Sequence, residues 1–496
     1  MKKQIGLLSV VFLAVLSGCK TDRGAASHSS EQPVFSEGKM KVAAPQVVVK
    51  PGDDLQAVLD SGADLVLKPG CIYDLSKELV YKKAGQKIST QNAHYPSQFA
   101  TLRIANWDLL QLVNAGGVEG AVLEHVILDE KRYKLSIKPK LYIDGKPATE
   151  PSLAYFGDQG GDNQIIRECV FVNARCWSTL KVHEGARNVL VENNIVLGAG
   201  GDCRGNGREQ NEGRVKWGDG ITFASRDSMI RNNMIIDPTD VGFVLFGSPG
   251  TIAESNVIAA ISRESLGGAN LVDPLDFYKL SENETDYRGV KVRNNTVDAF
   301  GARIHVGYPV GAPVWSPKNR GKFLTGGEVT DNVMTGEAGG YGFAAHTLKN
   351  WKITGNTSTA TYSGIADGLA PTNRAHEPTA FVYDPKTVEN SALQPEFVPC
   401  NPHIDHLLRC NHGPQDEKGY RIYPYGDAEA KAVVKAAYLE MLGREADEGG
   451  LKEHVAFLQA NTLNADGIRR RMMASEEFKG RYGTVAPEDL HVYRTK

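Results

Sequence analysis

Short stretches of alternating apolar and polar residues recur along the middle of the chain, and six of them carry the same motif. In each, an apolar, a polar and a small or polar residue precede an asparagine, and an apolar or β-branched residue follows it. The asparagines are Asn194, Asn233, Asn256, Asn295, Asn332 and Asn356. Alternation is typical of strands, and a unit repeated at intervals of 23, 24 and 37 to 39 residues predicts stacked coils.

The repeated asparagine predicts a ladder that holds the coils together. Asn tolerates the left-handed backbone region, and its side chain bonds locally in turns. Since stacked coils lie about 4.8 Å apart, an asparagine at the same corner of each coil reaches those above and below it. We therefore assign these residues to the architecture and not to catalysis.

A second strand follows each asparagine corner, and its alternation predicts which side chains point outward. We expect one outward column to contain Lys181, Thr222, Val244, Asn270, Arg303 and Ala344. The next contains His183, Ala224, Phe246, Val272, His305 and His346, which puts the last two on successive coils. These columns form a wall, and the insertions 199–217, 274–289 and 308–326 rise at its rim to make a groove.

Five phrases carry a resemblance to a known family. They are Trp217-Gly218-Asp219-Gly220-Ile221, Thr239-Asp240-Val241-Gly242, Leu245 to Gly250, Leu266 to Pro274, and Gly340-Tyr341-Gly342-Phe343. With the repeats, they resemble the right-handed parallel β-helix of the pectate-lyase superfamily over residues 44–370, and within it a poorly characterised secreted group of bacteria and fungi. The resemblance implies an all-β solenoid whose groove binds chains of sugar.

The first residues resemble a bacterial lipoprotein signal. Lys2 and Lys3 precede an apolar run, which ends in Leu16-Ser17-Gly18-Cys19. The resemblance implies removal of residues 1–18, a lipid on Cys19, and sorting to the outer membrane because Lys20 follows the cysteine. Residues 19–43 are rich in Ser, Ala, Gly and charge, so we expect a flexible tether there.

The composition changes after the repeats. Residues 371–426 are proline-rich and irregular, with one expected strand at 379–384 that covers a seam, whereas residues 427–484 carry helical spacing. Their Leu442-Gly443-Arg444 and Ser475-Glu476-Glu477-Phe478 phrases resemble a small helical domain of unknown function from bacterial surface proteins. The resemblance implies contact with a surface protein, and Arg444 with Asp447 is a structural pair.

The net charge limits the class of binding partner, and the cysteines predict disulfide bonds. A net charge of −3 argues against nucleic acid. Exported proteins form disulfides, and Cys400 and Cys410 bracket one loop, so they are the expected pair. In addition, Cys169 or Cys176 could reach Cys203 on the neighbouring coil.

Two carboxylates suit hydrolysis of a glycosidic bond, in which one acts as acid and the other as base or nucleophile. Asp219 and Asp240 occupy nearly the same position on adjacent coils, about 5 Å apart. Both precede or lie near glycine, where aspartate is also a common turn residue.

β-Elimination from a uronate needs a base and a cation that stabilises the enolate-like intermediate. We expect Arg303 to be that cation and His305 to lie beside it. Substrate contacts are assigned to Lys181, His183, Asn270, His346 and Trp217. Asp273, with Glu264 or Asp276, could hold Ca²⁺ through oxygen ligands.

The sequence therefore predicts a lipid-anchored parallel β-helix with a small all-α C-terminal domain, exported to the cell envelope. We expect it to bind and cleave a polysaccharide through Asp219, Asp240, Arg303 and His305, by elimination or hydrolysis. The alternative is a non-catalytic carbohydrate-binding or adhesion protein of the envelope, because fold alone does not establish catalysis.

Overall fold

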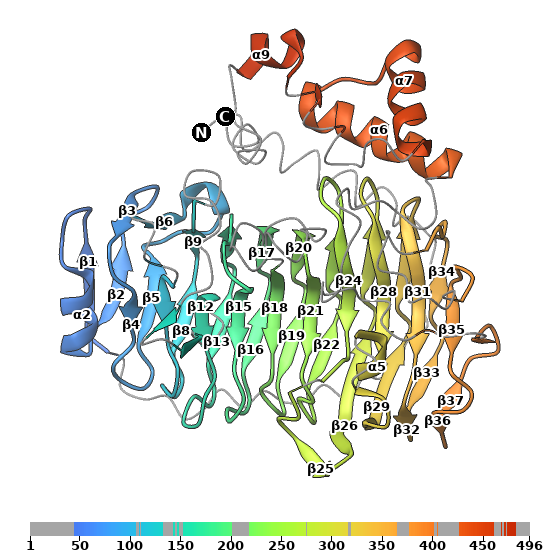
Figure 1. Ribbon diagram of the computed structural model, residues 1–496. Coiled ribbons are helices and arrows are strands. Elements are labelled where there is room, and N and C mark those ends of the chain that lie inside the picture. The colour runs from blue at the N-terminus through green and yellow to red at the C-terminus, as the bar shows by residue number, and fades with distance from the viewer. Residues whose placement is uncertain are drawn as a thin grey trace, which may run out of the picture.

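The computed structural model shows a long solenoid of short strands with a group of helices along one of its sides (Figure 1). The structure describes residues 44–105, 109, 111–131, 142–143, 146–147, 152–200, 218–273, 275–315, 319–364, 376–400, 404, 426–460, 468, 471–472 and 474–482. Successive coils pair in parallel and build three sheets, which confirms the predicted parallel β-helix. None of the described helices is long and apolar enough to cross a membrane.

Sheet A has 15 strands and precedes the asparagine corner. Its main path is β1 (Gln46–Val49), β2 (Asp64–Leu67), β5 (Lys87–Thr90), β8 (Val122–Glu124), β13 (Ile165–Arg167), β16 (Leu190–Glu192), β19 (Met229–Arg231), β22 (Ile252–Glu254), β26 (Glu284–Arg293), β29 (Phe323–Thr330), β32 (Leu348–Lys349) and β36 (Val388–Glu389). Beside this path lie β25 (Lys279–Ser281), β33 (Lys352–Thr354) and β37 (Ala392–Leu393).

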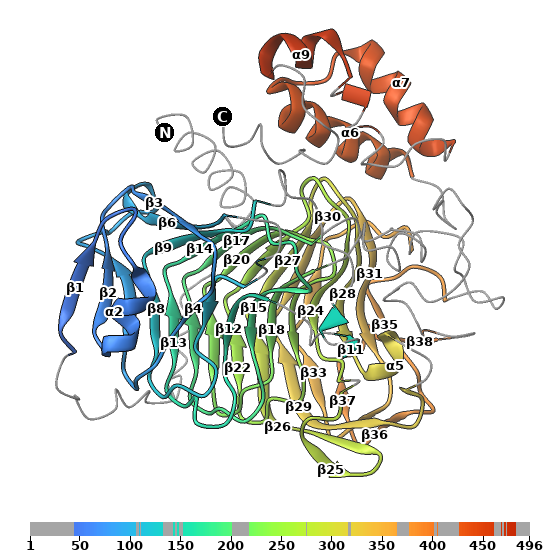
Figure 2. The same cartoon turned by 60° about the vertical axis from the view of Figure 1, so that its left-hand side comes forward.

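Sheet B has ten strands and follows that corner. It contains β3 (Ile72–Leu75), β6 (Ala100–Ile104), β9 (Val126–Asp129), β14 (Val170–Val172), β17 (Ile195–Ala199), β20 (Met234–Pro238), β23 (Val257–Ala259), β27 (Thr296–Ala299), β30 (Val333–Gly336) and β34 (Thr357–Ser358). Its strands run along the top of the solenoid in Figure 2.

Sheet C has 11 strands and carries the predicted wall. It contains β4 (Leu79–Val80), β7 (Val113–Asn114), β12 (Ser152–Phe156), β15 (Ser178–Val182), β18 (Asp219–Phe223), β21 (Val241–Leu245), β24 (Ser265–Asn270), β28 (Ile304–Val310), β31 (Gly339–Ala345), β35 (Phe381–Tyr383) and β38 (Val398–Pro399). Since β35 pairs in parallel with β31, the coils continue beyond residue 370, and the strand expected at 379–384 is a further rung instead of a seam cover. The short strands β10 (Tyr142–Ile143) and β11 (Lys146–Pro147) form a separate antiparallel pair.

The asparagine ladder is present as predicted. Each ladder Nδ2 donates to the Oδ1 of the next asparagine, at 2.9 to 3.0 Å from Asn194 through to Asn356. The same Oδ1 atoms accept the backbone N–H of the preceding ladder residue. The left-handed backbone belongs to the residue before each asparagine, such as Asn193 (φ 55°) and Ser255 (φ 56°). The ladder therefore satisfies buried polar groups that the turn would otherwise leave without partners.

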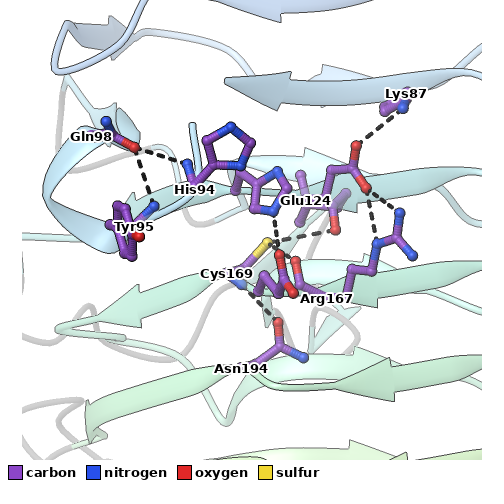
Figure 3. Close-up of polar contacts among 11 residues, drawn as sticks. Lys87, His94, Tyr95, Gln98, Glu124, Arg167, Cys169 and Asn194 are labelled. Atoms are coloured by element: carbon purple, nitrogen blue, oxygen red, sulfur yellow. Dashed lines mark hydrogen bonds and ion pairs between the residues drawn. The ribbon is translucent and has the colours of Figure 1, made fainter. Parts of the chain in front are cut away.

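The first coils replace the ladder asparagine by other residues (Figure 3). Cys169 takes its place one coil before Asn194, and its backbone N–H donates to Asn194 Oδ1 at 3.0 Å. Beside this corner, Glu124 accepts from Lys87 at 3.0 Å and from Arg167 at 2.7 Å. Ion pairs of this kind link neighbouring coils, so this corner is structural.

The N-terminal end of the solenoid is covered by helix α2 (Leu55–Ser61). Asp54 caps it by accepting the Ala57 N–H at 3.1 Å, and Leu55 and Leu59 are buried in the core. A helix at this end covers the open coil, where unpaired strand edges would favour aggregation.

The C-terminal helices are α6 (Asp427–Leu442), α7 (Glu448–Gln459) and α9 (Glu476–Tyr482), and they share an apolar core of their own. Arg444 contacts Asp447 at 3.3 Å and Glu477 at 2.8 Å, so the predicted structural pair is present. Ala436 of α6 is buried but lies outside that core, and it packs against Gly301 of the solenoid. The helices thus lie above the solenoid near the end of β27, which Figure 2 labels.

Candidate functional site

The outer face of sheet C divides into a polar part and a covered apolar part. From β21 onward it carries a second apolar layer that includes Val241, Val244, Leu266, Val306, Tyr341 and Ala344. Val314 of the short helix α5 (Ala312–Trp315) also belongs to this layer, and so does Ile404. Over β12, β15 and β18 the outward side chains are polar. We call these residues the polar strip: Tyr155, Asp158, Ser178, Lys181, His183, Asp219 and Thr222.

A column of glycines determines which residues of these strands face out. A Cβ at Gly220 would lie 2.5 Å from Ile235 Cγ2, and one at Gly242 would lie 2.6 Å from Ile258 Cγ1, both in the solenoid interior. These positions therefore point inward, as do the residues that follow them. Asp219 and Thr222, on either side of this inward pair, both point outward.

Asp219 is held by a chain of side-chain hydrogen bonds. Thr222 Oγ1 donates to Asp219 Oδ2 at 2.6 Å and lies 2.6 Å from Ser178 Oγ on the neighbouring strand. Asp219 is opposite Ser178, whereas the Asp240 N–H donates to Gly218 O at 3.1 Å. The two predicted catalytic acids thus lie on adjacent coils, and both are half-buried. In the register of the two coils, their positions differ by one residue.

His183 belongs to a second polar group at the other edge of the strip. Its Nδ1 lies 3.1 Å from Asp158 Oδ1, and Tyr155 Oη donates to the same oxygen at 2.9 Å. Burial, and secondly the hydrogen bond to Asp158, raise the pKa of Tyr155, so its phenol stays protonated. Lys181 lies directly opposite Tyr155 on one side and Thr222 on the other. The strip is therefore continuous from Asp158 to Asp219.

Aromatic rings line the His183 edge of the strip. The Phe277 ring lies 5.4 Å from the His183 ring and 6.0 Å from the Phe246 ring. Phe277 comes from the insertion before β26, which is held down where Tyr278 Oη donates to Ala224 O at 2.5 Å. Flat rings beside polar groups suit a sugar, which presents one apolar face and a rim of hydroxyls.

Arg303 and His305 are buried, which corrects the prediction that they line an open groove. Their exposed fractions are 1% and 2%. Arg303 Nη2 donates to Ser363 Oγ at 2.6 Å, and His305 Nε2 lies 3.9 Å from Glu264 Oε2. They do lie near Asp240 in the sheet, because Ser265 Oγ donates to Asp240 O and the Ser265 N–H donates to Arg303 O. Both side chains are therefore shielded from solvent, and neither belongs to the polar strip.

The register of β28 also differs from the predicted columns. Ser265 is opposite Ile304 and Leu271 is opposite Val310, so Asn270 faces Pro309 and not Arg303. In the next coil Val310 is opposite Ala345, so His346 is not in the column of His305. The predicted alignment had placed β28 six residues too early. Both Asn270 and His346 are buried, and His346 Nε2 lies 3.4 Å from Asp384.

Of the proposed calcium ligands, Glu264 does not converge with Asp273, whereas Asp276 lies beside it. Glu264 precedes β24 and Asp273 follows it, so they are roughly 20 Å or more apart along an extended strand. Asp273 Oδ1 accepts the backbone N–H groups of Leu275 and Asp276, and the Asp276 carboxylate contacts Lys322 at 2.5 Å. Burial raises the pKa of Asp273 to about 6. In the described part of the chain, no three His, Cys, Asp or Glu side chains are grouped for a metal.

Several predicted residues lie outside the described part of the chain: Trp217, Cys19, Cys203 and Cys410. The Cys400–Cys410 disulfide therefore stays a prediction. The alternative partners of Cys203 hold thiols here, since Cys169 Sγ donates to Arg167 O at 3.2 Å and Cys176 Sγ donates to Glu130 at 3.1 Å.

Sequence reasoning missed Tyr155, Asp158 and Phe277. Tyr155 alternates with buried Ala154 and Phe156 in β12, so its outward direction was readable. The loop residues Asp158 and Phe277 carry no periodic signal, and only the stacking of distant coils brings them to His183.

Comparisons with known proteins concern the fold. No family model matches the chain, and no curated protein matches it. Among solved structures, the tailspike of E. coli bacteriophage HK620 in complex with a pentasaccharide is 13% identical, with a TM-score of 0.45 over 71% of this chain. The match spans 62% of the tailspike's length. The catalytic domain of a GH87 α-1,3-glucanase in complex with nigerose is 9% identical, covering 77% of this chain and 71% of that one (TM-score 0.41). The A-module of the Azotobacter vinelandii mannuronan C-5 epimerase AlgE6 is 13% identical, covering 70% and 95% (TM-score 0.30).

Proposed function

We propose that this protein binds a polysaccharide across the polar strip of sheet C and cleaves it there. The observation that carries the proposal is the continuity of the strip: Asp219 lies on β18, Lys181 and His183 lie on and directly after β15, and Asp158, which pairs with His183, follows β12. A strip across stacked strands suits an extended ligand, because each coil advances the surface by about 4.8 Å.

The aromatic edge supports a sugar ligand over other extended polymers. Phe277 and Phe246 form an apolar margin beside hydroxyl, amine and carboxylate groups. Sites for small polar ligands combine such apolar walls with a few placed polar groups. Asp219 is also oriented for acid–base work, because Thr222 Oγ1 donates to one of its oxygens.

The test is incubation of the whole chain with polygalacturonate, alginate, hyaluronate and dextran. Binding is measured by calorimetry, and cleavage by new reducing ends and by the ultraviolet absorbance of an unsaturated product. Elimination gives both signals, whereas hydrolysis gives reducing ends alone. Absence of binding to all four polymers and to a wider glycan array contradicts the proposal.

The alternative is a non-catalytic envelope protein that only binds carbohydrate. The burial of Arg303 and His305 favours it, because neither side chain reaches a ligand in this arrangement. Binding without any product after prolonged incubation would support this alternative.

The proposed location is the cell envelope, with the chain held by a lipid on Cys19 and the C-terminal helices contacting a surface protein. The proposal rests on the sequence signals alone. A Cys19→Ser variant should move from the membrane fraction to the soluble fraction, and unchanged fractionation would contradict the anchor.

A further inference from the structure

We propose that His183 is the base that removes a proton from a uronate residue, that Asp158 fixes its imidazole, and that Lys181 binds the uronate carboxylate. This inference rests on the proposed function and narrows it to a substrate class, uronic-acid polysaccharides, and to one reaction, β-elimination.

The charge beside His183 favours one of its tautomers. Asp158 Oδ1 lies 3.1 Å from Nδ1, within ion-pair distance, and a carboxylate there favours the proton on Nδ1. A histidine held in this way presents Nε2 as a lone pair. No hydrogen bond joins Nε2 to a side chain of the described residues, and 26% of the His183 side chain is exposed, so a ligand can reach the ring.

The position of Asp158 is itself built into the fold. Its backbone is left-handed (φ 64°), and Tyr155 Oη donates to the same Oδ1 at 2.9 Å. Gly116 on the preceding coil makes room, since a Cβ there would lie 2.7 Å from Asp158 Oδ2 and 2.9 Å from Tyr155. Three coils thus hold one carboxylate against one imidazole. Such support is what a proton-transfer group needs to keep its direction.

Lys181 lies two residues before His183 on β15, on the same outward face. The two backbones are therefore about 7 Å apart along the strand. That separation matches a base at the α-carbon of a uronate and an ammonium group at its carboxylate. The ammonium ion neutralises the carboxylate, so the negative charge of the enolate-like intermediate is stabilised.

The elimination balances without any further reactant. His183 Nε2 takes the proton from C5, and the C–H electron pair forms the C4–C5 double bond. The C4–O bond breaks, and the leaving oxygen takes a proton from water. The imidazolium ion then returns its proton to solvent. One product fragment ends in a new reducing end with a free anomeric hydroxyl, and the other begins with a sugar that carries a conjugated, ultraviolet-absorbing double bond.

The other described histidines near sheet C do not offer an open nitrogen in this way. His305 is buried beside Glu264, and His346 bonds Thr347 and lies against Asp384. A useful comparison is His125, which also pairs with a carboxylate, that of Glu168, but at the A–B corner and far from the strip. It provides a matched control.

The experiment compares the full-length protein with His183→Gln, Asp158→Asn, Lys181→Ala and the control His125→Gln, on the uronate polymer that the wild type degrades. We expect His183→Gln to lower kcat by about 10²- to 10⁴-fold with KM little changed. Asp158→Asn should lower kcat by about tenfold or more with unchanged binding, because the tautomer is no longer fixed. Lys181→Ala should lose the preference for polygalacturonate over its methyl ester, and His125→Gln should behave as wild type.

Different failures are distinguishable. If the wild type binds no polysaccharide, the proposed function fails. If it cleaves but His183→Gln keeps most of the wild-type kcat, the assignment of the base is overturned. If the products carry reducing ends without the double bond and Asp219→Asn abolishes them, the reaction is hydrolysis and the inference is wrong. Thermal unfolding of each variant checks that the fold is retained.

Discussion

Removing one rung of the asparagine ladder should destabilise the solenoid far more than removing its exposed neighbour. Asn256 is fully buried, and its Oδ1 accepts the Asn233 backbone N–H at 3.0 Å and the Asn233 Nδ2 at 2.9 Å. Its own Nδ2 donates to Ile230 O at 3.0 Å and to Asn295 Oδ1 at 2.9 Å. Asn256→Ala deletes all four bonds in the dry interior.

The magnitude follows from the groups that lose a partner. Two Asn233 donors lose their acceptor, and each buried unsatisfied donor costs about 1–3 kcal/mol. We therefore expect a loss of about 2–6 kcal/mol in the free energy of unfolding. Ser255→Ala is the matched control, because Ser255 is exposed at the same corner and its side chain holds no rung. It should cost within about 0.5 kcal/mol.

Urea unfolding gives the global change, and hydrogen exchange of the Asn233 amide reports on the broken rung directly. A local loss of about 2 kcal/mol makes that amide exchange roughly 30-fold faster. If Asn256→Ala unfolds within about 1 kcal/mol of wild type and the Asn233 amide keeps its protection, the ladder does not stabilise the corner as argued.

Three further predictions test other features of the structure. Burial raises the pKa of Asp298 to about 6, so above that pH its charged form destabilises the folded state. Below about pH 4 the carboxyl is protonated in both the folded and the unfolded state, and this destabilisation is absent. Asp298→Asn should thus raise the free energy of unfolding by about 1–2 kcal/mol at about pH 7, and this gain should be absent at about pH 4. Urea midpoints that shift equally at the two pH values would refute the prediction. Gly242→Ala should cost about 1–3 kcal/mol, because its Cβ meets Ile258, whereas Gly480→Ala, which has open space, should not destabilise, as thermal melts will show. Ala436→Arg should separate the helices from the solenoid and increase protease cleavage between them, with solenoid melting unchanged; a digestion pattern like that of wild type would mean that this contact does not hold them.

The repeated pattern was sufficient to predict the solenoid and its ladder. These features depend on local rules: alternation places apolar side chains inside, and an asparagine at each corner meets its copies above and below. The inward residues Ile221 and Phe243 of sheet C were readable for the same reason.

The register of β28 could not be predicted from the sequence, because the chain between β24 and β28 carries a long insertion. Alternation has a period of two, so a shift of six residues leaves the same parity and cannot be detected from the pattern. Only the backbone hydrogen bonds between coils fix which residues are opposite one another.

Exposure and the grouping of the site were likewise decided by the tertiary structure. An outward-facing residue such as Arg303 is buried because a second layer covers that part of sheet C, and strand alternation contains no information on what lies above a sheet. Asp158 and His183 meet because adjacent coils stack at the spacing of paired strands, although 25 residues separate them along the chain. The sequence by itself determined the coil, whereas the stacking of coils and the segments that cover them determined which side chains form a site.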